Sequence, residues 1–302
     1  MRQFLPGLLF AALWSSASVA TKFGVAVAHP LVLANVRFFI AGFVMLVFAY
    51  AIRRQHNRLP RGKEWKQLVI FSFLNTTVYL GAYVIALKHV SAGIGSLSTA
   101  TNPLFIIILS AIWLKRKLRM LEVAGLIIGL TGVVIASYPL LQTSHASVEG
   151  LVILFAAMIS VSAATVYYAG ITWQLENVVI NGWQVLIGGL LLLPFTLING
   201  GIASTHFNKQ FWGSVLWLVI PVSIAALQLW FYLVKQDAVK ASLWLFLCPI
   251  FGFIYAAIIL HEPITWHTYA GTMLVIAGLY LAQREKLTGN SGSAEKVKYI
   301  TE

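Results

Sequence analysis

Apolar runs of about 20 residues recur along the whole chain, and they constrain the fold more than any other feature of the sequence. Each run is long enough to cross a hydrocarbon core of roughly 30 Å as an α-helix. Only helices and closed barrels cross lipid, because lipid offers backbone groups no hydrogen-bond partners. The runs lack the strand-like alternation of a barrel. The sequence therefore predicts an all-α integral membrane protein.

The composition argues against a soluble protein. Of the 302 residues, 59% are hydrophobic and only 10% are charged, which is too little charge to cover a soluble surface. The formal charge of +12 raises the question of nucleic-acid binding. The basic residues, however, fall in short clusters between apolar runs, a pattern typical of membrane orientation. We therefore expect the lipid bilayer as a partner, and no nucleic acid.

Ten spans are predicted, and the loop charges orient them. With the N-terminus inside, 17 of the 21 Lys and Arg residues fall in the inner segments. Because basic residues accumulate on the cytoplasmic side, both termini are predicted to be cytoplasmic in a bacterial-type inner membrane. The predicted spans are 4–27, 30–52, 67–87, 91–114, 120–138, 149–170, 179–199, 211–233, 241–260 and 267–282.

The chain contains an internal repeat. When it is shifted by 146 residues, 14 of the 50 positions from Leu87 to Ala136 are identical without a gap. The more informative matches are Ser96 with Ser242, Pro103 with Pro249, Gly125 with Gly271 and Gly132 with Gly278. Five spans are an odd number, so the second copy enters the membrane from the opposite side, as in many secondary transporters. We therefore predict two inverted five-helix repeats, residues 1–138 and 149–282, around a central cavity, followed by a disordered cytoplasmic tail over 283–302.

Three stretches of the sequence form a further pattern. They are Trp14-Ser15-Ser16 with Lys22; Ala86-Leu87 through Ser91-Ala92-Gly93 to Pro103; and Ala241-Ser242-Leu243-Trp244-Leu245-Phe246-Leu247 with Pro249, Leu260-His261-Glu262-Pro263-Ile264-Thr265 and Gly271. Together they resemble the EamA-type ten-helix exporters of the drug/metabolite transporter superfamily. One departure is that the Gly-Glu usual after the fourth helix reads Lys115-Arg116 here. The resemblance implies transport: members of the group export amino acids, other small metabolites or drugs, and related branches carry sugar phosphates and nucleotide sugars.

We expect a transporter that moves small organic metabolites, such as amino acids or similar amphipathic solutes, and exports them by alternating access. An exchanger of anionic or phosphorylated metabolites that uses Lys22 and Arg37 is the second hypothesis. An integral membrane enzyme or a sensor is less favoured, because no nucleophile, base and metal ligands converge and no soluble domain is appended. We predict no catalytic residue, cofactor or metal, and a monomer or homodimer. The lack of a midspan carboxylate favours facilitated diffusion or exchange over proton antiport.

Polar and aromatic residues recur near mid-membrane depth, where they suit a cavity for an amphipathic solute. The predicted substrate-binding residues are Trp14, Asn75, Tyr79, Tyr83, Asn102, Trp183, Gln184, Gln228, Trp230 and Trp244.

Five further residues are predicted to act in gating or charge recognition. Lys22 and Arg37 are ionisable groups inside spans, each of which costs a few kcal/mol unless it is paired or hydrated. An ion pair between Arg37 and Glu262 is the predicted latch of the outer gate. Pro103 and Pro249 lie near midspan in repeat-related helices, and proline kinks a helix because it lacks a backbone donor.

Overall fold

The computed structural model describes residues 4–53, 57–113, 119–142, 146–198, 201–236 and 244–287, and the regular elements in these ranges are all helices. In chain order they are α1 (Phe4–Val25), α2 (Pro30–Val47), η1 (Phe48–Ile52), α3 (Lys63–Ser72), η3 (Phe73–Leu80), α4 (Gly81–His89), α5 (Ala92–Thr99), α6 (Asn102–Trp113), α7 (Met120–Gln142), α8 (Val148–Ala169), α9 (Asn177–Ile198), α10 (Lys209–Trp217), η4 (Leu218–Ala226), α11 (Leu227–Gln236), η5 (Trp244–Leu247), α13 (Cys248–Leu260) and α14 (Trp266–Leu287). The elements η1, η3 and η4 are π-helices and η5 is a 3₁₀-helix.

Eight helical segments in the described ranges are long and apolar enough to cross a membrane. Their bounds agree with predicted spans to within a few residues, and Pro30–Ile52 coincides with the span predicted at 30–52. Cys248–Leu260 is apolar but shorter. The helix α14 continues to Leu287, so the first residues of the predicted tail are helical, and residues 288–302 lie outside the described ranges. The count of ten spans stays a prediction.

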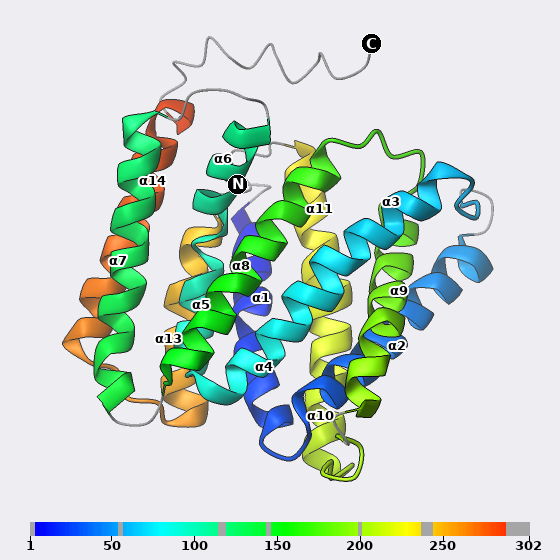
Figure 1. Cartoon of the computed structure of the whole chain (residues 1–302), viewed down its shortest axis with the longest axis horizontal. Helices are drawn as coiled ribbons and strands as arrows, with labels where there is room; N and C mark the ends of the chain where they lie inside the picture. Colours follow the sequence, from blue (N-terminus) through cyan, green and yellow to red (C-terminus); the bar gives the residue numbers. More distant parts are fainter. Residues whose placement is uncertain are drawn as a thin grey trace.

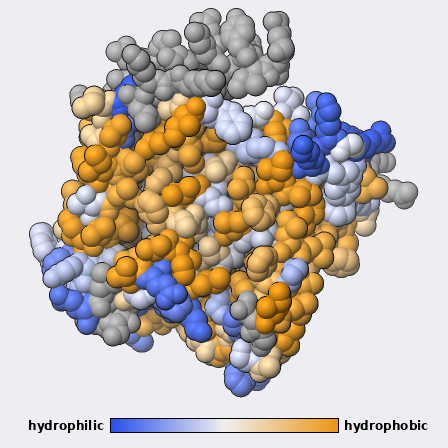
Figure 2. All heavy atoms as spheres, in the orientation of Figure 1, coloured by the Kyte–Doolittle hydropathy of each residue, from blue (hydrophilic) through white to orange (hydrophobic). Residues whose placement is uncertain are grey.

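Large apolar side chains cover the outside of the molecule. Phe43 is 66% exposed, Ile127 60% and Ile258 69%. Figure 2 shows apolar residues across the middle of one face, with hydrophilic residues gathered toward its upper right and lower edges. Such a continuous apolar surface is unstable in water but matches a lipid environment. Together with the apolar helices, it identifies a multi-pass membrane protein.

Two antiparallel helix pairs form opposite ends of the molecule. The pair α7 and α14 lies at the left of Figure 1, and the pair α2 and α9 lies at the right. Glycines permit the first pair to pack closely: a Cβ on Gly132 would lie 2.6 Å from the carbonyl oxygen of Gly271, and one on Gly278 would lie 2.5 Å from that of Gly125. Under the 146-residue shift, each of these two contacts is the image of the other.

Between the two pairs, the first helix of each predicted repeat packs against helices of the other repeat. The helix α1 contacts α10, η4 and α13, whereas α8 contacts α4, α6 and η3. The middle of the molecule therefore consists of two mixed groups of helices. The start of α1 and the end of α14 lie on the same side, at the top of Figure 1. We call this the terminal side, and the opposite one the distal side.

Irregular helical turns recur at related positions of the two repeats. The π-helices η3 and η4 begin at Phe73 and Leu218, which are 145 residues apart. Pro221 accounts for the second one, because proline removes a backbone donor and frees a carbonyl group. The predicted proline kinks are helix breaks: α6 starts at the residue before Pro103, and Pro249 lies in the first turn of α13. Proline is tolerated in a first turn because no intrahelical bond is lost there.

The close contact of α7 and α14 can be tested with a single methyl group. Replacing Gly278 by Ala places a Cβ 2.5 Å from the carbonyl oxygen of Gly125, so one helix must move. Overpacking of this kind costs about 1–3 kcal/mol, and the melting temperature should fall by roughly 3–8 °C in a thermal shift assay. At Gly170 the same change meets atoms no closer than 3.6 Å, so Gly170→Ala is the matched control. Equal melting temperatures for the two variants would contradict the packing.

Candidate functional site

A central cavity of about 240 Å³ lies between the two mixed groups of helices. Its lining residues come mainly from α1, α2, η4 and α11 and from η3, α6, α8 and α9. Phe10 and Trp14 line it from the first half of α1, while Thr165 and Tyr168 line it from the end of α8. Since α1 begins and α8 ends on the terminal side, the cavity lies toward that side.

Four amide side chains line the cavity, and two of them carry an unused hydrogen-bonding atom. The Gln184 carbonyl oxygen is already occupied, because it accepts from Asn75 at 3.0 Å and from Thr76 at 2.9 Å. By contrast, Asn102 Oδ1 and Asn181 Nδ2 are buried with no partner among the described residues. Both residues line the cavity. Because an unsatisfied buried polar group costs about 1–3 kcal/mol, one free acceptor and one free donor here suit a polar ligand.

Arg37 brings a positive charge to the same cavity. It is 7% exposed, and its Nε and Nη2 donate to the Ser223 hydroxyl at 3.2 and 3.1 Å. No carboxylate among the described residues pairs with it. A guanidinium has five donors, so this side chain retains donors for a further partner. A buried cation on the wall of an intramembrane cavity attracts an anionic group, because the low dielectric of its surroundings strengthens the attraction.

The structure brings six of the ten predicted substrate-binding residues to this cavity, together with two of the five gating or charge residues. The residues that line it are Trp14, Asn75, Tyr79, Asn102, Gln184 and Trp230, with Arg37 and Pro103.

The other four predicted binding residues lie elsewhere. Tyr83 belongs to a buried apolar cluster, and Gln228 faces outward and is exposed. Trp183 donates to the Tyr50 hydroxyl at 2.9 Å, and Trp244 packs in an apolar cluster beside α1. Depth in the membrane can be estimated from sequence position, whereas the direction of a side chain around its helix depends on how that helix packs.

Asn181, Ser223 and Tyr168 are among the lining residues that the sequence did not single out. A signal for Asn181 was present, because it precedes the selected Gln184 by three residues and so shares its helix face. Ser223 follows Pro221 inside the π-helix η4, which changes the direction of side chains relative to a regular helix. Nothing in the sequence separates Tyr168 from the other aromatic residues.

Small side chains close the cavity toward the distal side. There α5 packs against α13 and α1. The Ser18 and Ser96 hydroxyls are 2.8 Å apart, and Gly252 faces Ser96 so closely that a Cβ would overlap it. Gly93 makes the same kind of contact with the Phe253 ring. Because these residues are small, the three helices approach without leaving a passage.

Hydrogen bonds between loops of the two predicted repeats join the distal surface. The His206 amide donates to the Val27 carbonyl at 2.8 Å, and the His29 amide donates to the Thr205 hydroxyl at 3.1 Å. The His29 Nδ1 accepts a bond from an amide in the first turn of α2. Burial, and then the charge of Lys88, lower the pKa of His29. A lowered pKa favours the neutral ring, which is the form whose nitrogen can accept this bond.

Glu262 also links the two predicted repeats on the distal side. Its carboxylate accepts from the Ala92 amide at 2.7 Å and from the Gly93 amide at 3.2 Å, where α5 begins. Amides at a helix start lack partners within the helix, and the helix dipole favours a negative charge there. Glu262 also acts electrostatically on Lys22, near the end of α1. The connection between α13 and α14 is thereby held to the start of α5.

The predicted ion pair between Arg37 and Glu262 is wrong for this conformation. Arg37 faces the central cavity and bonds to Ser223, while Glu262 bonds to the backbone of α5. The sequence placed both residues in the outer half of the membrane, but it could not reveal that free amides lie closer to the carboxylate. Lys22 does not line the cavity, and Pro249 is buried at the start of α13.

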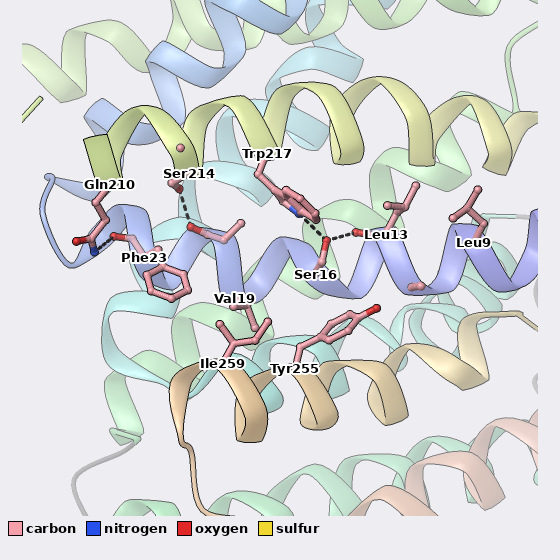
Figure 3. Close-up of a pocket in the computed structure, with 13 residues that line it drawn as sticks. Leu9, Leu13, Ser16, Val19, Phe23, Gln210, Ser214, Trp217, Tyr255 and Ile259 are labelled. Carbon is pink, nitrogen blue, oxygen red and sulfur yellow. Dashed lines mark hydrogen bonds between the residues drawn. The ribbon is translucent and has the colours of Figure 1, made fainter. Parts of the chain in front are cut away.

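A second hollow, a groove of about 660 Å³, lies on the other side of α1. Figure 3 shows α1 running between α10 and α13, with Leu13 and Ser16 of α1, Trp217 of α10 and Tyr255 of α13 along the groove. Ser16, Gln210, Ser214 and Trp217 bond within the protein: Trp217 donates to the Ser16 hydroxyl at 2.8 Å, for example. The groove and the central cavity are therefore lined by different faces of α1.

Known proteins resemble the chain over nearly its whole length. The model of the EamA-like transporter family matches residues 3–138 and again 148–283. An uncharacterized transporter of Archaeoglobus fulgidus is 26% identical over 95% of this chain and all of its own. The uncharacterized transporter YvbV of Bacillus subtilis is 26% identical over 89% of this chain and 87% of its own, and the uncharacterized inner membrane transporter YedA of Escherichia coli is 28% identical over 78% and 76%. One crystal structure of a protein, 21% identical, shares the fold with a TM-score of 0.65 and covers 96% of this chain and 99% of its own.

The Glu262 contact can be tested by hydrogen exchange. Replacing Glu262 by Ala removes the acceptor of the Ala92 and Gly93 amides. Hydrogen bonds to a charged group contribute about 1.5–3 kcal/mol, so exchange at the start of α5 should accelerate roughly 10- to 100-fold. Glu149→Ala is the control, because Glu149 is an exposed acid in the first turn of α8. Unchanged exchange in the Glu262 variant would show that the carboxylate does not hold α5.

Proposed function

Because the chain belongs to the EamA-like transporter family, we propose that it carries small organic solutes, amino acids or similar amphipathic metabolites, through its central cavity by alternating access. The observation that supports this most directly is the cavity itself: a polar, partly unsatisfied hollow inside the apolar region, between helices of both predicted repeats. Export is the proposed direction. The proposal assigns transport rather than catalysis to the chain.

The mechanism we propose rests on two inverted five-helix repeats, residues 1–138 and 149–282. The two family matches, the glycine contacts of α7 with α14 and the related positions of η3 and η4 all support an internal symmetry. Inverted halves give one protein two nearly equivalent shapes that open to opposite sides. Because α1 packs against helices of the second repeat and α8 against helices of the first, the moving bodies are the two mixed groups of helices.

We place the protein in the inner membrane with both termini in the cytoplasm. The distribution of Lys and Arg supports this orientation, and the printed name of the Escherichia coli relative supports the membrane. In this orientation the terminal side is cytoplasmic. The cavity toward that side and the closed distal contacts then correspond to an inward-facing state.

The dimensions of the cavity favour a small cargo. Its 240 Å³ is below the roughly 300–1,000 Å³ of pockets for drug-sized ligands. Aromatic rings of Trp14, Tyr79 and Trp230 form apolar surface, while Asn102 and Asn181 offer a free acceptor and a free donor. A free acceptor suits an ammonium group and a free donor suits a carboxylate. An amino acid combines both groups with an apolar side chain, and it is therefore the proposed cargo.

Arg37 supports a second candidate, the exchange of anionic or phosphorylated metabolites. Its guanidinium lines the cavity and has no acidic partner among the described residues, and it can bind a carboxylate or phosphate group by two parallel hydrogen bonds. Lys22, which was expected to assist, lies outside the cavity, so this candidate rests on Arg37 alone.

Counterflow in proteoliposomes tests the proposed function. Labelled amino acids, sugars and phosphorylated metabolites are offered with and without a pH gradient, and we expect accumulation of amino acids. Asn102→Ala should reduce that flux roughly tenfold, because the cavity loses its free acceptor. Gln228→Ala is the control, since Gln228 is exposed and outside the cavity. No flux of any solute, or equal losses in the two variants, would refute the proposal.

Arg37→Gln separates the two candidates. If the cargo is anionic, the variant loses exchange of anions selectively, by roughly 10- to 100-fold, because a charge-assisted bond contributes about 1.5–3 kcal/mol. If the cargo is a neutral or zwitterionic solute held mainly by the amides, its flux persists. The ratio of anion to neutral-solute counterflow in the same liposomes is the measurement. A ratio equal to that of the unaltered protein would exclude anion recognition by Arg37.

A further inference from the structure

We propose that the groove between α1, α10 and α13 holds one acyl chain of a bilayer phospholipid. This inference is independent of the cargo of the central cavity, because it concerns the outer face of α1. The groove is continuous with the apolar surface that faces lipid. Leu9, Trp217 and Ile259 line it, and each is 46–47% exposed. Its ordinary surroundings are therefore hydrocarbon, not water.

The lining is almost entirely apolar, and its polar side chains apart from the Tyr255 hydroxyl bond within the protein. The Ser16 hydroxyl donates to the Leu13 carbonyl at 2.6 Å and accepts from the Trp217 indole. The Ser214 hydroxyl donates to the carbonyl of Ala20 at 2.6 Å. These polar groups are thus satisfied within the protein. A polar ligand would lose its hydration here and find few partners beyond the Tyr255 hydroxyl, whereas a hydrocarbon chain has no hydrogen bonds to lose.

At the distal end of the groove, the Gln210 amide donates to the carbonyl of Phe23 at 2.9 Å, as Figure 3 shows. Gln210 is exposed, and its backbone lies in the first turn of α10, at the edge of the membrane span. The groove therefore passes from an apolar interior to a polar rim. A phospholipid has the same order of groups along its length, with a polar head at the membrane surface and an apolar chain inside.

The length of the groove fits one acyl chain. Along α1 the lining runs from Leu9 to Phe23, which corresponds to roughly 21 Å of helix. One leaflet occupies about half of the 30 Å hydrocarbon core, so a chain of that leaflet fits within this length.

The walls of the groove belong to both predicted repeats, since α1 lies in the first and α10 and α13 lie in the second. The opposite face of α1 presents Phe10 and Trp14 to the central cavity. A chain in the groove therefore packs against the helix that separates lipid from the cavity. By filling the groove between α1, α10 and α13, the acyl chain stabilises the conformation in which this groove is open.

Gly213 provides a variant that fills the groove without disturbing the fold. It lines the groove, and a Cβ added there meets no atom within 4 Å. Its φ is not in the left-handed region, so a larger residue is compatible with α10 and favours the helix over Gly. Gly213→Phe therefore occupies the space of the chain. Leu216→Phe is the control, because Leu216 is 53% exposed on the same helix and does not line the groove.

The test uses the full chain in lipid nanodiscs that contain phosphatidylglycerol with a photoactivatable diazirine in one acyl chain. After illumination, mass spectrometry should locate single-lipid adducts mainly on α1 between Leu9 and Phe23 and on α10. Gly213→Phe should reduce these adducts roughly tenfold, a loss equivalent to 1.4 kcal/mol, while Leu216→Phe leaves them unchanged.

Three results would overturn the proposal. The first is adducts spread evenly over the exposed residues of α2, α9 and the groove in the unaltered protein, a result that needs no variant. The second is equal labelling in Gly213→Phe and Leu216→Phe. The third is that a covalently linked dimer of the protein, labelled in the same way, carries no adducts in the groove. That result would identify a second copy of the chain as the occupant. Because labelling does not depend on solute flux, failure here leaves the transport proposal standing, and the converse also holds.

Discussion

The lack of hydrogen-bond partners in lipid is the constraint on which the rest of this structure depends. Hydroxyl groups inside the helices meet it by bonding to carbonyl groups one turn earlier, as Ser15 does to Ala11 and Ser72 to Leu68. Buried polar groups that lack such a partner are therefore informative. Asn102 and Asn181 each keep an unused buried atom, and both line the central cavity. Asn35 and Thr272 also keep an unused buried atom inside spans away from the cavity, so the atoms of Asn102 and Asn181 support a polar site because they coincide with the cavity.

Close contact between backbones is the second requirement, and small residues supply it. Glycines let α7 pack on α14, while Gly252, Ser96 and Ser18 let α13, α5 and α1 meet on the distal side. The first contact lies at one end of the molecule, away from the central cavity, whereas the second closes the cavity. Contacts between small residues bury little area, so they can separate and re-form at modest cost, as a gate requires.

Much of the fold followed from the sequence, and less of the site did. Hydropathy located eight of the predicted spans because length and apolarity are properties of consecutive residues. The 146-residue repeat singled out Gly125, Gly132, Gly271 and Gly278 but did not predict which of them meet. Arg37 and Gln184 were found because polar residues are rare in spans. The position of Trp183 and the partner of Glu262 were missed, since they depend on helix rotation and on the first turn of α5, which no local pattern records.

The central claim is that the distal and terminal sides open alternately around one cavity. Double electron–electron resonance in liposomes tests it directly, after the buried Cys248 is replaced by Ala. One pair of spin labels joins the two groups of helices on the distal side, at the exposed Ala203 before α10 and Glu149 of α8, and a separate pair joins them on the terminal side, at the exposed Leu5 of α1 and Ala169 of α8. When Glu262→Ala weakens the distal contact, the distal distance should lengthen while the terminal distance shortens. Distances that stay fixed, or that change in the same direction, would contradict alternating access.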